Sequence, residues 1–226
     1  MPRALAVHSV LEALAYLCAV LTYLAVRRRH GDTIAVRDRI TVFAGAAAGA
    51  AVGTRLLFYL CDPVHLTPFG GKTIVGGLLG GLIGVELAKK LAGIRRSTGD
   101  LLVLPIIVAI AIGRIGCFLA GTADGTHGLP SDLPWAIDGR HPVALYEIAF
   151  VLLLIPIVRR VRGREGDAFK VFLASYLAFR FFVDFLKPLP VPIAGGLTSI
   201  QWACAAGLAF YAAVFARRLT GERATA

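Results

Sequence analysis

The sequence lacks any long polar segment. Every polar stretch between its apolar runs is about twenty residues or shorter, which is too short for a separate soluble domain. Paired cysteines are also missing, because Cys18, Cys61, Cys117 and Cys204 show no CxxC spacing. Without that spacing, the cysteines indicate neither a zinc site nor a redox pair. We therefore expect no bound metal and no cofactor.

The motifs of common soluble enzymes are absent as well. The sequence contains no P-loop, no dinucleotide-binding GxGxxG after a strand, no GxSxG and no HExxH. The sequence therefore does not indicate a nucleotide-dependent enzyme, a serine hydrolase with a GxSxG motif or a zinc protease with an HExxH motif. What the sequence has instead is apolar residues.

Apolar residues make up 57% of the 226 residues, and the mean hydropathy is +0.73. Soluble domains do not sustain repeated apolar runs of about twenty residues. Window hydrophobicity therefore predicts an all-α integral membrane protein in a single polytopic domain, residues 1–226, with seven transmembrane helices. The predicted spans are residues 4–26, 40–60, 73–92, 101–120, 142–158, 169–186 and 197–216, with an outer polar loop at 121–141.

The basic residues are distributed unevenly between the two sides of these spans. Seventeen of the 24 lie in the first, third and fifth connections and in the C-terminal tail: Arg27, Arg28, Arg29, Arg37, Arg39, Lys89, Lys90, Arg95, Arg96, Arg159, Arg160, Arg162, Arg164, Lys170, Arg217, Arg218 and Arg223. Only four lie on the other side: Arg3, Lys72, Arg140 and Lys187. The positive-inside rule then predicts that the N-terminus is outside and the C-terminus is cytoplasmic. The net charge of +10 faces anionic lipid, so no nucleic-acid partner is expected.

The remaining three basic residues, Arg55, Arg114 and Arg180, fall inside predicted spans. Each lies five to seven residues before the outer end of its span, which is roughly 8–10 Å below the outer surface. A charge in the membrane centre costs roughly 2.5–3.5 kcal/mol on insertion scales, so these arginines require an explanation. One explanation is a pocket for a phospholipid headgroup, because arginine binds phosphate in a bidentate manner. The other is Arg–Glu and Arg–Asp pairs that hold helices together, since Glu12, Glu147 and Asp184 lie at similar depth.

Small residues and one aromatic residue complete the pattern. Glycines spaced four apart predict close helix packing at Gly45, Gly49 and Gly53. Trp135, which follows Pro134 near re-entry into apolar sequence, is typical of an interfacial anchor.

Three segments form the most specific pattern in the chain. They are Gly113-Arg114-Ile115-Gly116-x-Phe118, Ser131-Asp132-Leu133-Pro134-Trp135 and Arg140-His141-Pro142-x-x-Leu145-Tyr146-Glu147. Weaker patterns are Gly53-x-Arg55-Leu56 with Phe58-Tyr59, Gly76-Gly77-Leu78 with Gly84, and Phe179-Arg180-Phe181 with Val183-Asp184-Phe185-x-Lys187. Together they resemble the prolipoprotein diacylglyceryl transferase family over most of the chain.

The resemblance implies a function. Enzymes of that family take a diacylglyceryl group from phosphatidylglycerol and place it on a lipobox cysteine thiol of a prolipoprotein, releasing glycerol phosphate. It implies a multi-pass protein of the bacterial cytoplasmic membrane, with phosphatidylglycerol, a prolipoprotein and the bilayer as partners in lipoprotein biosynthesis. The candidate catalytic residues are Arg114, Arg180 and His141. The candidate substrate-binding residues are Arg55, Gly76, Gly77, Tyr146, Glu147 and Asp184.

The chain departs from the family pattern at four positions. Val75 stands where the family has a histidine, Cys117 where it has an asparagine, Thr122 where it has a glutamate and Val10 where it has a tyrosine. A valine transfers no proton, so the base is expected elsewhere, at His8, His127 or His141, of which we choose His141.

These departures leave several readings open. Cys117 is interpreted either as an inert thiol or as a nucleophile beside Arg114, since a nearby cation lowers a thiol pKa. A disulfide between Cys61 and Cys117 is neither predicted nor excluded. The alternative functions are a non-catalytic lipid-binding protein that kept the fold, and a secondary transporter, which fits less well because no repeat and no midplane polar cluster is visible.

Overall fold

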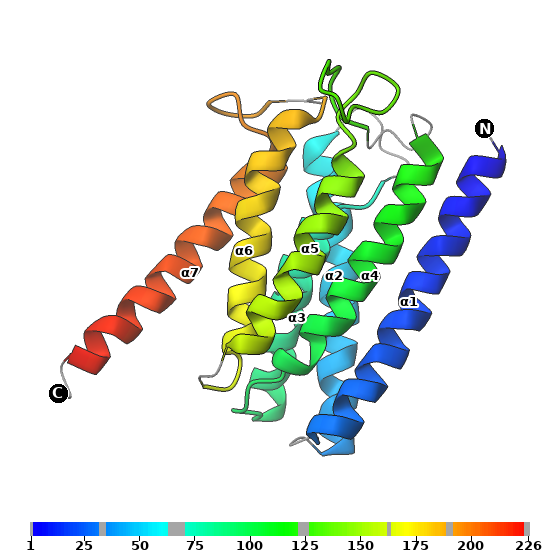
Figure 1. Cartoon of the computed structure of the whole chain (residues 1–226). Helices are drawn as coiled ribbons and strands as arrows, with labels where there is room; N and C mark the ends of the chain where they lie inside the picture. Colours follow the sequence, from blue (N-terminus) through cyan, green and yellow to red (C-terminus); the bar gives the residue numbers. More distant parts are fainter. Residues whose placement is uncertain are drawn as a thin grey trace. The chain divides into compact units, whose positions relative to one another are not determined.

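The computed structural model describes residues 2–31, 35–62, 71–121, 127–161, 164–188 and 192–223, with side chains described outside 2–6, 30 and 219–223. The described residues form α1 Pro2–His30, α2 Val36–Cys61, α3 Ile74–Ala92, α4 Asp100–Ala120, α5 Val143–Arg160, α6 Asp167–Val183, the 3-10 helix η2 Asp184–Leu186 and α7 Ser199–Arg223 (Figure 1). Each predicted span overlaps one of these α-helices. The all-helical class predicted from hydropathy is confirmed.

Four helices in the described part of the chain are long and apolar enough to cross a membrane. They cover Val7–Arg29, Val36–Cys61, Asp100–Ala120 and Ser199–Arg218. The other three are shorter or more charged: α6 has 17 residues, α3 contains Glu86, Lys89 and Lys90, and α5 contains Glu147, Arg159 and Arg160. The chain is therefore a multi-pass membrane protein, and the count of seven spans stays a prediction.

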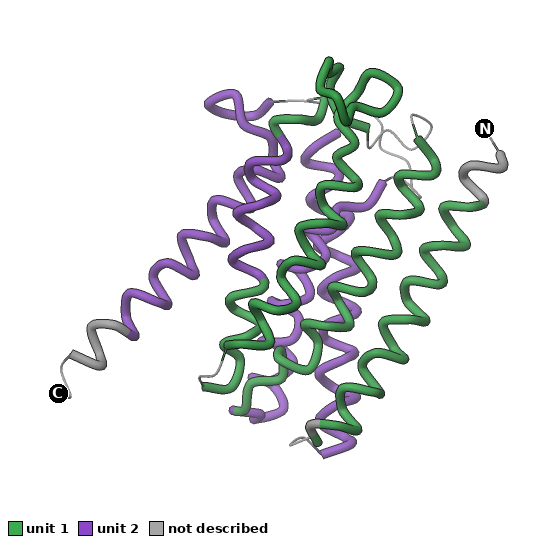
Figure 2. Tube along the Cα trace, in the orientation of Figure 1, with its two compact units in different colours: residues 1–33, 96–172, 185–188 green, residues 34–95, 173–184, 189–226 purple. Residues whose placement is uncertain are grey.

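The helices fall into two compact units. Unit 1 consists of residues 1–33, 96–172 and 185–188, and unit 2 of residues 34–95, 173–184 and 189–226 (Figure 2). The division falls within α6.

In unit 1, α4 packs against both α1 and α5. The approach of α1 is close at Gly116, where an added Cβ would lie 3.2 Å from the Cβ of Leu11 and 3.4 Å from Nδ1 of His8. Asp100, in the first turn of α4, accepts hydrogen bonds from the backbone N–H groups of Gly166 (2.6 Å) and Phe169 (3.0 Å). These are donors at the start of α6 that have no partner within the helix, so the carboxylate caps that end.

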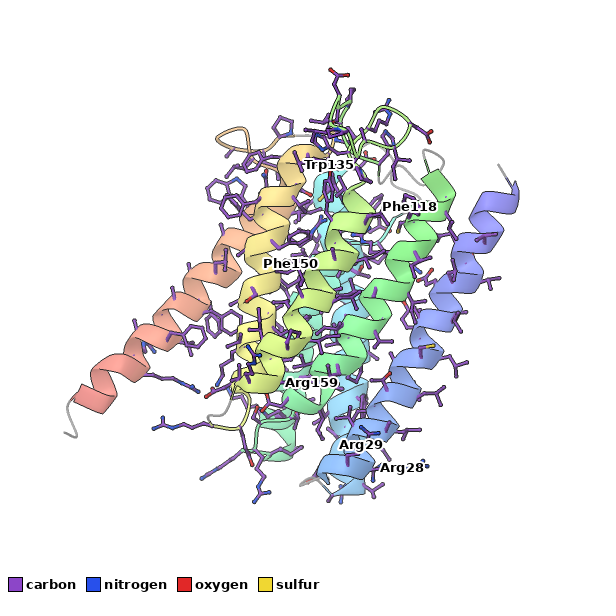
Figure 3. All side chains as sticks on the ribbon, viewed as in Figure 1. Arg28, Arg29, Phe118, Trp135, Phe150 and Arg159 are labelled. Carbon is purple, nitrogen blue, oxygen red and sulfur yellow. The ribbon has the colours of Figure 1, made fainter. Side chains whose placement is uncertain are left out.

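The two ends of unit 1 differ in chemistry. Arg28 and Arg29 at the end of α1 and Arg159 at the end of α5 lie at one end, and Trp135 lies at the opposite end (Figure 3). Phe118, in the last turn of α4, lies toward the Trp135 end. A basic end and an aromatic end are the arrangement expected of helices that cross a membrane.

In unit 2, α2 and α3 meet through their glycines. An added Cβ at Gly49 would overlap the carbonyl oxygen of Gly80, and one at Gly53 would overlap that of Gly76. Thr54 and Thr73 extend this contact: Oγ1 of Thr54 donates to the Thr73 carbonyl (2.8 Å) and accepts from its N–H (2.9 Å). The predicted close packing of these glycines is present, because small residues let helix backbones approach.

Candidate functional site

Arg114 is a buried cation on α4 with a carboxylate from the next helix beside it. Its Nε lies 2.9 Å from Oε2 of Glu147 on α5, and the two side chains are 9% and 0% exposed. Its Nη1 donates to Sγ of Cys117 over 3.6 Å, one turn along α4. An Arg–Glu pair of the kind expected as the structural alternative is therefore present, and it joins α4 to α5.

Tyr146, in the first turn of α5 and next to Glu147 in the chain, contacts two further side chains through its hydroxyl group. Its hydroxyl oxygen accepts a hydrogen bond of 2.8 Å from Nε1 of Trp135. Nδ1 of His141 lies 3.3 Å from the same oxygen, and the two rings meet edge to face with centroids 6.2 Å apart. Because an indole only donates, the phenol serves it as an acceptor and can give its own hydrogen to His141.

Arg180, in the last turn of α6 in unit 2, is paired within its own segment of chain. Its Nη2 donates to Oδ1 of Asp184 over 3.0 Å, and both side chains are almost wholly buried. The second carboxylate oxygen of Asp184 accepts from Oγ1 of Thr198 (2.8 Å). Both oxygens of this buried carboxylate therefore have donors, as a buried charge requires.

Thr198 also begins α7, a role that our sequence reasoning missed. Its Oγ1 accepts from the N–H of Gln201 (3.1 Å), and Oε1 of Gln201 accepts from the N–H of Thr198 (2.9 Å). This is a reciprocal capping box, and the sequence Thr198-Ser199-Ile200-Gln201 before an apolar run was the signal for it. Nε2 of Gln201 donates to the Phe181 carbonyl (3.2 Å), which fastens the start of α7 to α6.

The other predicted residues are placed as follows. Arg55 is half-buried on α2, six residues before its end at Cys61. Gly76 is buried against Gly53, whereas Gly77 touches little, since an added Cβ there would meet only the Cβ of Thr54 at 3.9 Å. Both glycines lie on α3, in unit 2 with Arg55.

Two of the positions that depart from the family pattern, Val75 and Cys117, lie on the helices α3 and α4. Val75 is 1% exposed in the first turn of α3. Cys117 is half-buried beside Arg114, and all four cysteines are free thiols. Thr122 lies outside the described residues.

Within unit 1 the structure thus brings together Arg114 with Glu147 and His141 with Tyr146. Within unit 2 it brings together Arg180 and Asp184. Each unit buries one guanidinium that a carboxylate holds in a fixed orientation. Fixed guanidinium donors in a low-dielectric setting suit recognition of a phosphate or another oxyanion.

These features define a multi-pass membrane protein with buried arginine–carboxylate pairs. A family model described as prolipoprotein diacylglyceryl transferase matches residues 2–217, and the chain belongs to this family. The phosphatidylglycerol–prolipoprotein diacylglyceryl transferase of Methylococcus capsulatus is 36% identical over 204 residues, covering 76% of this chain and 76% of the relative. Proteins of the same name from Bordetella avium (30% identical, covering 78% and 76%) and Geobacter sulfurreducens (31% identical, covering 74% and 73%) are similar as well.

Proposed function

We propose that this chain transfers the diacylglyceryl group of phosphatidylglycerol to the lipobox cysteine thiol of a prolipoprotein. The observation that carries the proposal is that the family match extends over residues 2–217 and includes both buried arginine–carboxylate pairs. The relatives named above carry this substrate and this acceptor in their names. The chain is in that case an enzyme of lipoprotein biosynthesis.

The reaction requires one bond exchange and one proton transfer. The thiolate attacks the glyceryl carbon that carries the phosphate, a sulfur–carbon bond forms, the carbon–oxygen bond to phosphate breaks, and glycerol phosphate leaves with the electron pair. The thiol proton goes to a base. Cationic donors on the departing phosphate stabilise the charge that develops there, and such donors are among the largest contributions to catalysis.

Arg114 is proposed to hold the phosphate of the lipid donor. Glu147 contacts the guanidinium at Nε, and the planar fork carries further N–H donors on its Nη atoms, which suit a phosphate. At present Nη1 donates to the sulfur of Cys117 over 3.6 Å. Sulfur is a weak acceptor, so a phosphate oxygen competes with it readily. Arg180, whose Nη2 is paired with Asp184, is proposed to assist at the reacting phosphate.

His141 is proposed as the base, with Tyr146 as its link to the thiol. The phenol lies 3.3 Å from Nδ1 of His141 and is held in place by Trp135. A proton that reaches the phenol oxygen is passed on when the phenol gives its own hydrogen to Nδ1. Proton transfer by a positioned group of this kind contributes about 10²–10⁴-fold to rate.

The remaining proposed substrate-binding residues lie in unit 2. Arg55 adds positive charge, and Gly76 and Gly77 supply backbone without side chains near the outer end of α3. Asp184 acts through Arg180. We propose that the reaction uses no metal and no cofactor.

The proposed location is the bacterial cytoplasmic membrane, with seven spans in one domain, the N-terminus outside and the C-terminus in the cytoplasm. The distribution of basic residues supports this orientation, and so does unit 1, where Arg28, Arg29 and Arg159 lie at the end opposite to Trp135. Phosphatidylglycerol and the bilayer are the lipid partners, and a prolipoprotein is the protein partner.

The direct test supplies purified protein with phosphatidylglycerol and a lipobox peptide and looks for the diacylglyceryl thioether by mass spectrometry. A peptide with serine in place of the lipobox cysteine is the control and is expected to stay unmodified. Arg114→Ala is expected to lower the yield of the adduct by at least about 10²-fold, the loss typical of one removed transition-state donor. An adduct formed at the wild-type rate by this variant contradicts the assignment of the site.

A second candidate function is a non-catalytic phospholipid-binding protein that kept the fold. It is favoured by Val75, which is 1% exposed and stands where the family pattern has a histidine, because a valine cannot transfer a proton. Folded protein that binds phosphatidylglycerol but gives no adduct supports this second function and contradicts the first.

A further inference from the structure

The chain between α4 and α5 contains a short defined hairpin, Leu129–His141, in unit 1. The N–H of His141 donates to the Leu129 carbonyl (3.0 Å), and the N–H of Ser131 donates to the Gly139 carbonyl (2.8 Å). The turn is closed by paired bonds of 3.0 Å between Ile137 and Arg140. Asp138 and Gly139 at its centre have φ values of 52° and 66°, the left-handed pair that tight hairpin turns require. The 129–141 hairpin is thus a fixed structure.

This hairpin exposes large apolar side chains. Leu129, Leu133, Trp135 and Ile137 are 39%, 38%, 57% and 40% exposed. Burying apolar surface contributes about 25 cal/mol of favourable free energy per Å². Four large exposed apolar side chains within one short segment therefore indicate a surface that is covered in the working protein.

The hairpin is attached where the membrane-crossing helices of unit 1 end. Trp135 is hydrogen-bonded to Tyr146 in the first turn of α5, and the Leu129 N–H donates to the Leu186 carbonyl (2.8 Å). Trp135 lies at the end of the unit opposite to Arg28, Arg29 and Arg159, and α4, which is long enough to span, runs toward that end (Figure 3). The hairpin with its exposed apolar side chains therefore lies at the end of unit 1 opposite to the basic end.

We propose that the 129–141 hairpin lies in the headgroup region of the bilayer, with Leu133, Trp135 and Ile137 inserted as far as the first methylenes of the lipid chains. The indole N–H of Trp135 is already bonded to Tyr146, so its ring enters lipid without leaving a donor unpaired. Pro130 and Pro134 carry no N–H, which further reduces the number of donors to be desolvated.

Two acids set the depth of insertion. Asp132 and Asp138 are exposed on the same hairpin. A carboxylate is costly in the hydrocarbon and stays in the headgroup layer or in water, so the insertion is shallow. This inference rests on the membrane-crossing helices and not on the transfer reaction, so its test requires no enzymatic activity.

The chain offers a clean probe, because Trp135 and Trp202 are its only two tryptophans. In the Trp202→Phe variant, reconstituted in phosphatidylcholine–phosphatidylglycerol vesicles, all tryptophan emission comes from Trp135. Phosphatidylcholine brominated close to the headgroup is expected to quench most of this emission. The same lipid brominated near the chain end is expected to quench less, and iodide in the buffer is expected to quench little.

Matched variants sharpen the test. In the Trp202→Phe background, Leu133→Ser with Ile137→Ser is expected to shift Trp135 emission to longer wavelength and to increase quenching by iodide. Asp132→Ser, at an exposed position of the same hairpin, removes a charge and no apolar surface, so it is expected to produce neither the shift to longer wavelength nor the added quenching by iodide. Trp135→Phe leaves Trp202 on α7, a candidate span, as the positive control for quenching by brominated lipid.

Three results overturn the proposal. Strong iodide quenching without quenching by brominated lipid places the hairpin in water. Stronger quenching by bromines near the chain end than by those near the headgroup places it too deep. Protection from iodide that appears only on adding a lipobox peptide, without quenching by brominated lipid, assigns the surface to peptide.

Discussion

The two buried arginines are held in different ways. In unit 1, Arg114 on α4 has its carboxylate partner on another helix, because Glu147 belongs to α5. In unit 2, Arg180 and Asp184 are four residues apart in one segment of chain. Asp184 also accepts a hydrogen bond from the hydroxyl of Thr198, whereas Arg114 also donates to the thiol of Cys117.

This difference separates two kinds of site. The Arg114–Glu147 pair exists only when α4 packs on α5, so it contributes to that packing as well as orienting the guanidinium. The Arg180–Asp184 pair forms with the last turn of α6 and the start of η2, and its tertiary contribution comes from Thr198 at the start of α7. Removing a carboxylate therefore has a larger structural effect in unit 1, and removing the hydroxyl of Thr198 tests the tertiary contact in unit 2.

The largest effect is expected for Glu147→Ala. Arg114 is then left as a buried charge without its carboxylate, and breaking such a pair typically costs 3–5 kcal/mol, so about that loss is expected. The thermal unfolding midpoint of the purified protein in detergent should fall strongly, and transfer to the lipobox peptide should be lost with it.

A double variant separates stability from function at this pair. Arg114→Met with Glu147→Leu removes both charges and fills the space with apolar atoms, which is often neutral or stabilising. We expect the unfolding midpoint to recover toward that of the wild type while the thioether adduct stays absent. Recovery of both would show that Arg114 serves only to join α4 and α5.

The next largest effect is expected at the glycine contact of unit 2. There α2 and α3 meet through backbone atoms, whereas α4 and α5 are joined at Arg114 through side chains. In Gly80→Ala the new Cβ would overlap the Gly49 carbonyl oxygen and lie 2.8 Å from Cα of Gly53. Both are backbone atoms that move only with their helix, so we expect a loss of about 1–3 kcal/mol in the free energy of unfolding.

The adjacent position provides the matched control. In Gly81→Ala the nearest atoms would be the Ala46 carbonyl oxygen and the Ala50 Cβ, both at 3.6 Å, which is ordinary van der Waals contact. This variant should unfold at the wild-type midpoint or slightly above it. Equal losses in the two variants would contradict the backbone contact between α2 and α3.

A smaller effect is expected for Thr198→Val, which tests the tertiary contact of the Arg180 pair. The change removes the cap of α7 and the donor to Asp184 while keeping the shape of the side chain. Loss of an N-cap typically costs about 0.5–2 kcal/mol. Thr198→Ser keeps the hydroxyl and should unfold near the wild-type midpoint, whereas a loss in Thr198→Ser without one in Thr198→Val would show that the methyl group, not the hydroxyl, holds this end of α7.

The sequence was sufficient to predict the helices, because a run of about twenty apolar residues leaves few alternatives to a helix. The spacing of four between Arg180 and Asp184 places them on one helix face, so the sequence contained enough to predict this pair as well. The partner of Arg114 depended on which helices pack together, and hydropathy does not encode that. The link from Trp135 to Tyr146 depended on the path of the hairpin between α4 and α5. The cap at Thr198 was visible as a local motif and was overlooked.

The smallest effect is expected for Cys117→Ala, which tests how much the thiol contributes to holding Arg114. The bond from Arg114 Nη1 to Sγ is long, at 3.6 Å, and its acceptor is weak. The donor is charged, but the length and the weak acceptor limit the contribution to about 1.5 kcal/mol, so transfer should stay within about tenfold of the wild-type rate. Cys18→Ala, at another half-buried thiol of unit 1, is the matched control and should leave the rate unchanged. Complete loss of transfer in Cys117→Ala with an unaltered unfolding midpoint would instead identify this thiol as a nucleophile, and the site of unit 1 would then differ from that of unit 2 in its chemistry as well as in its packing.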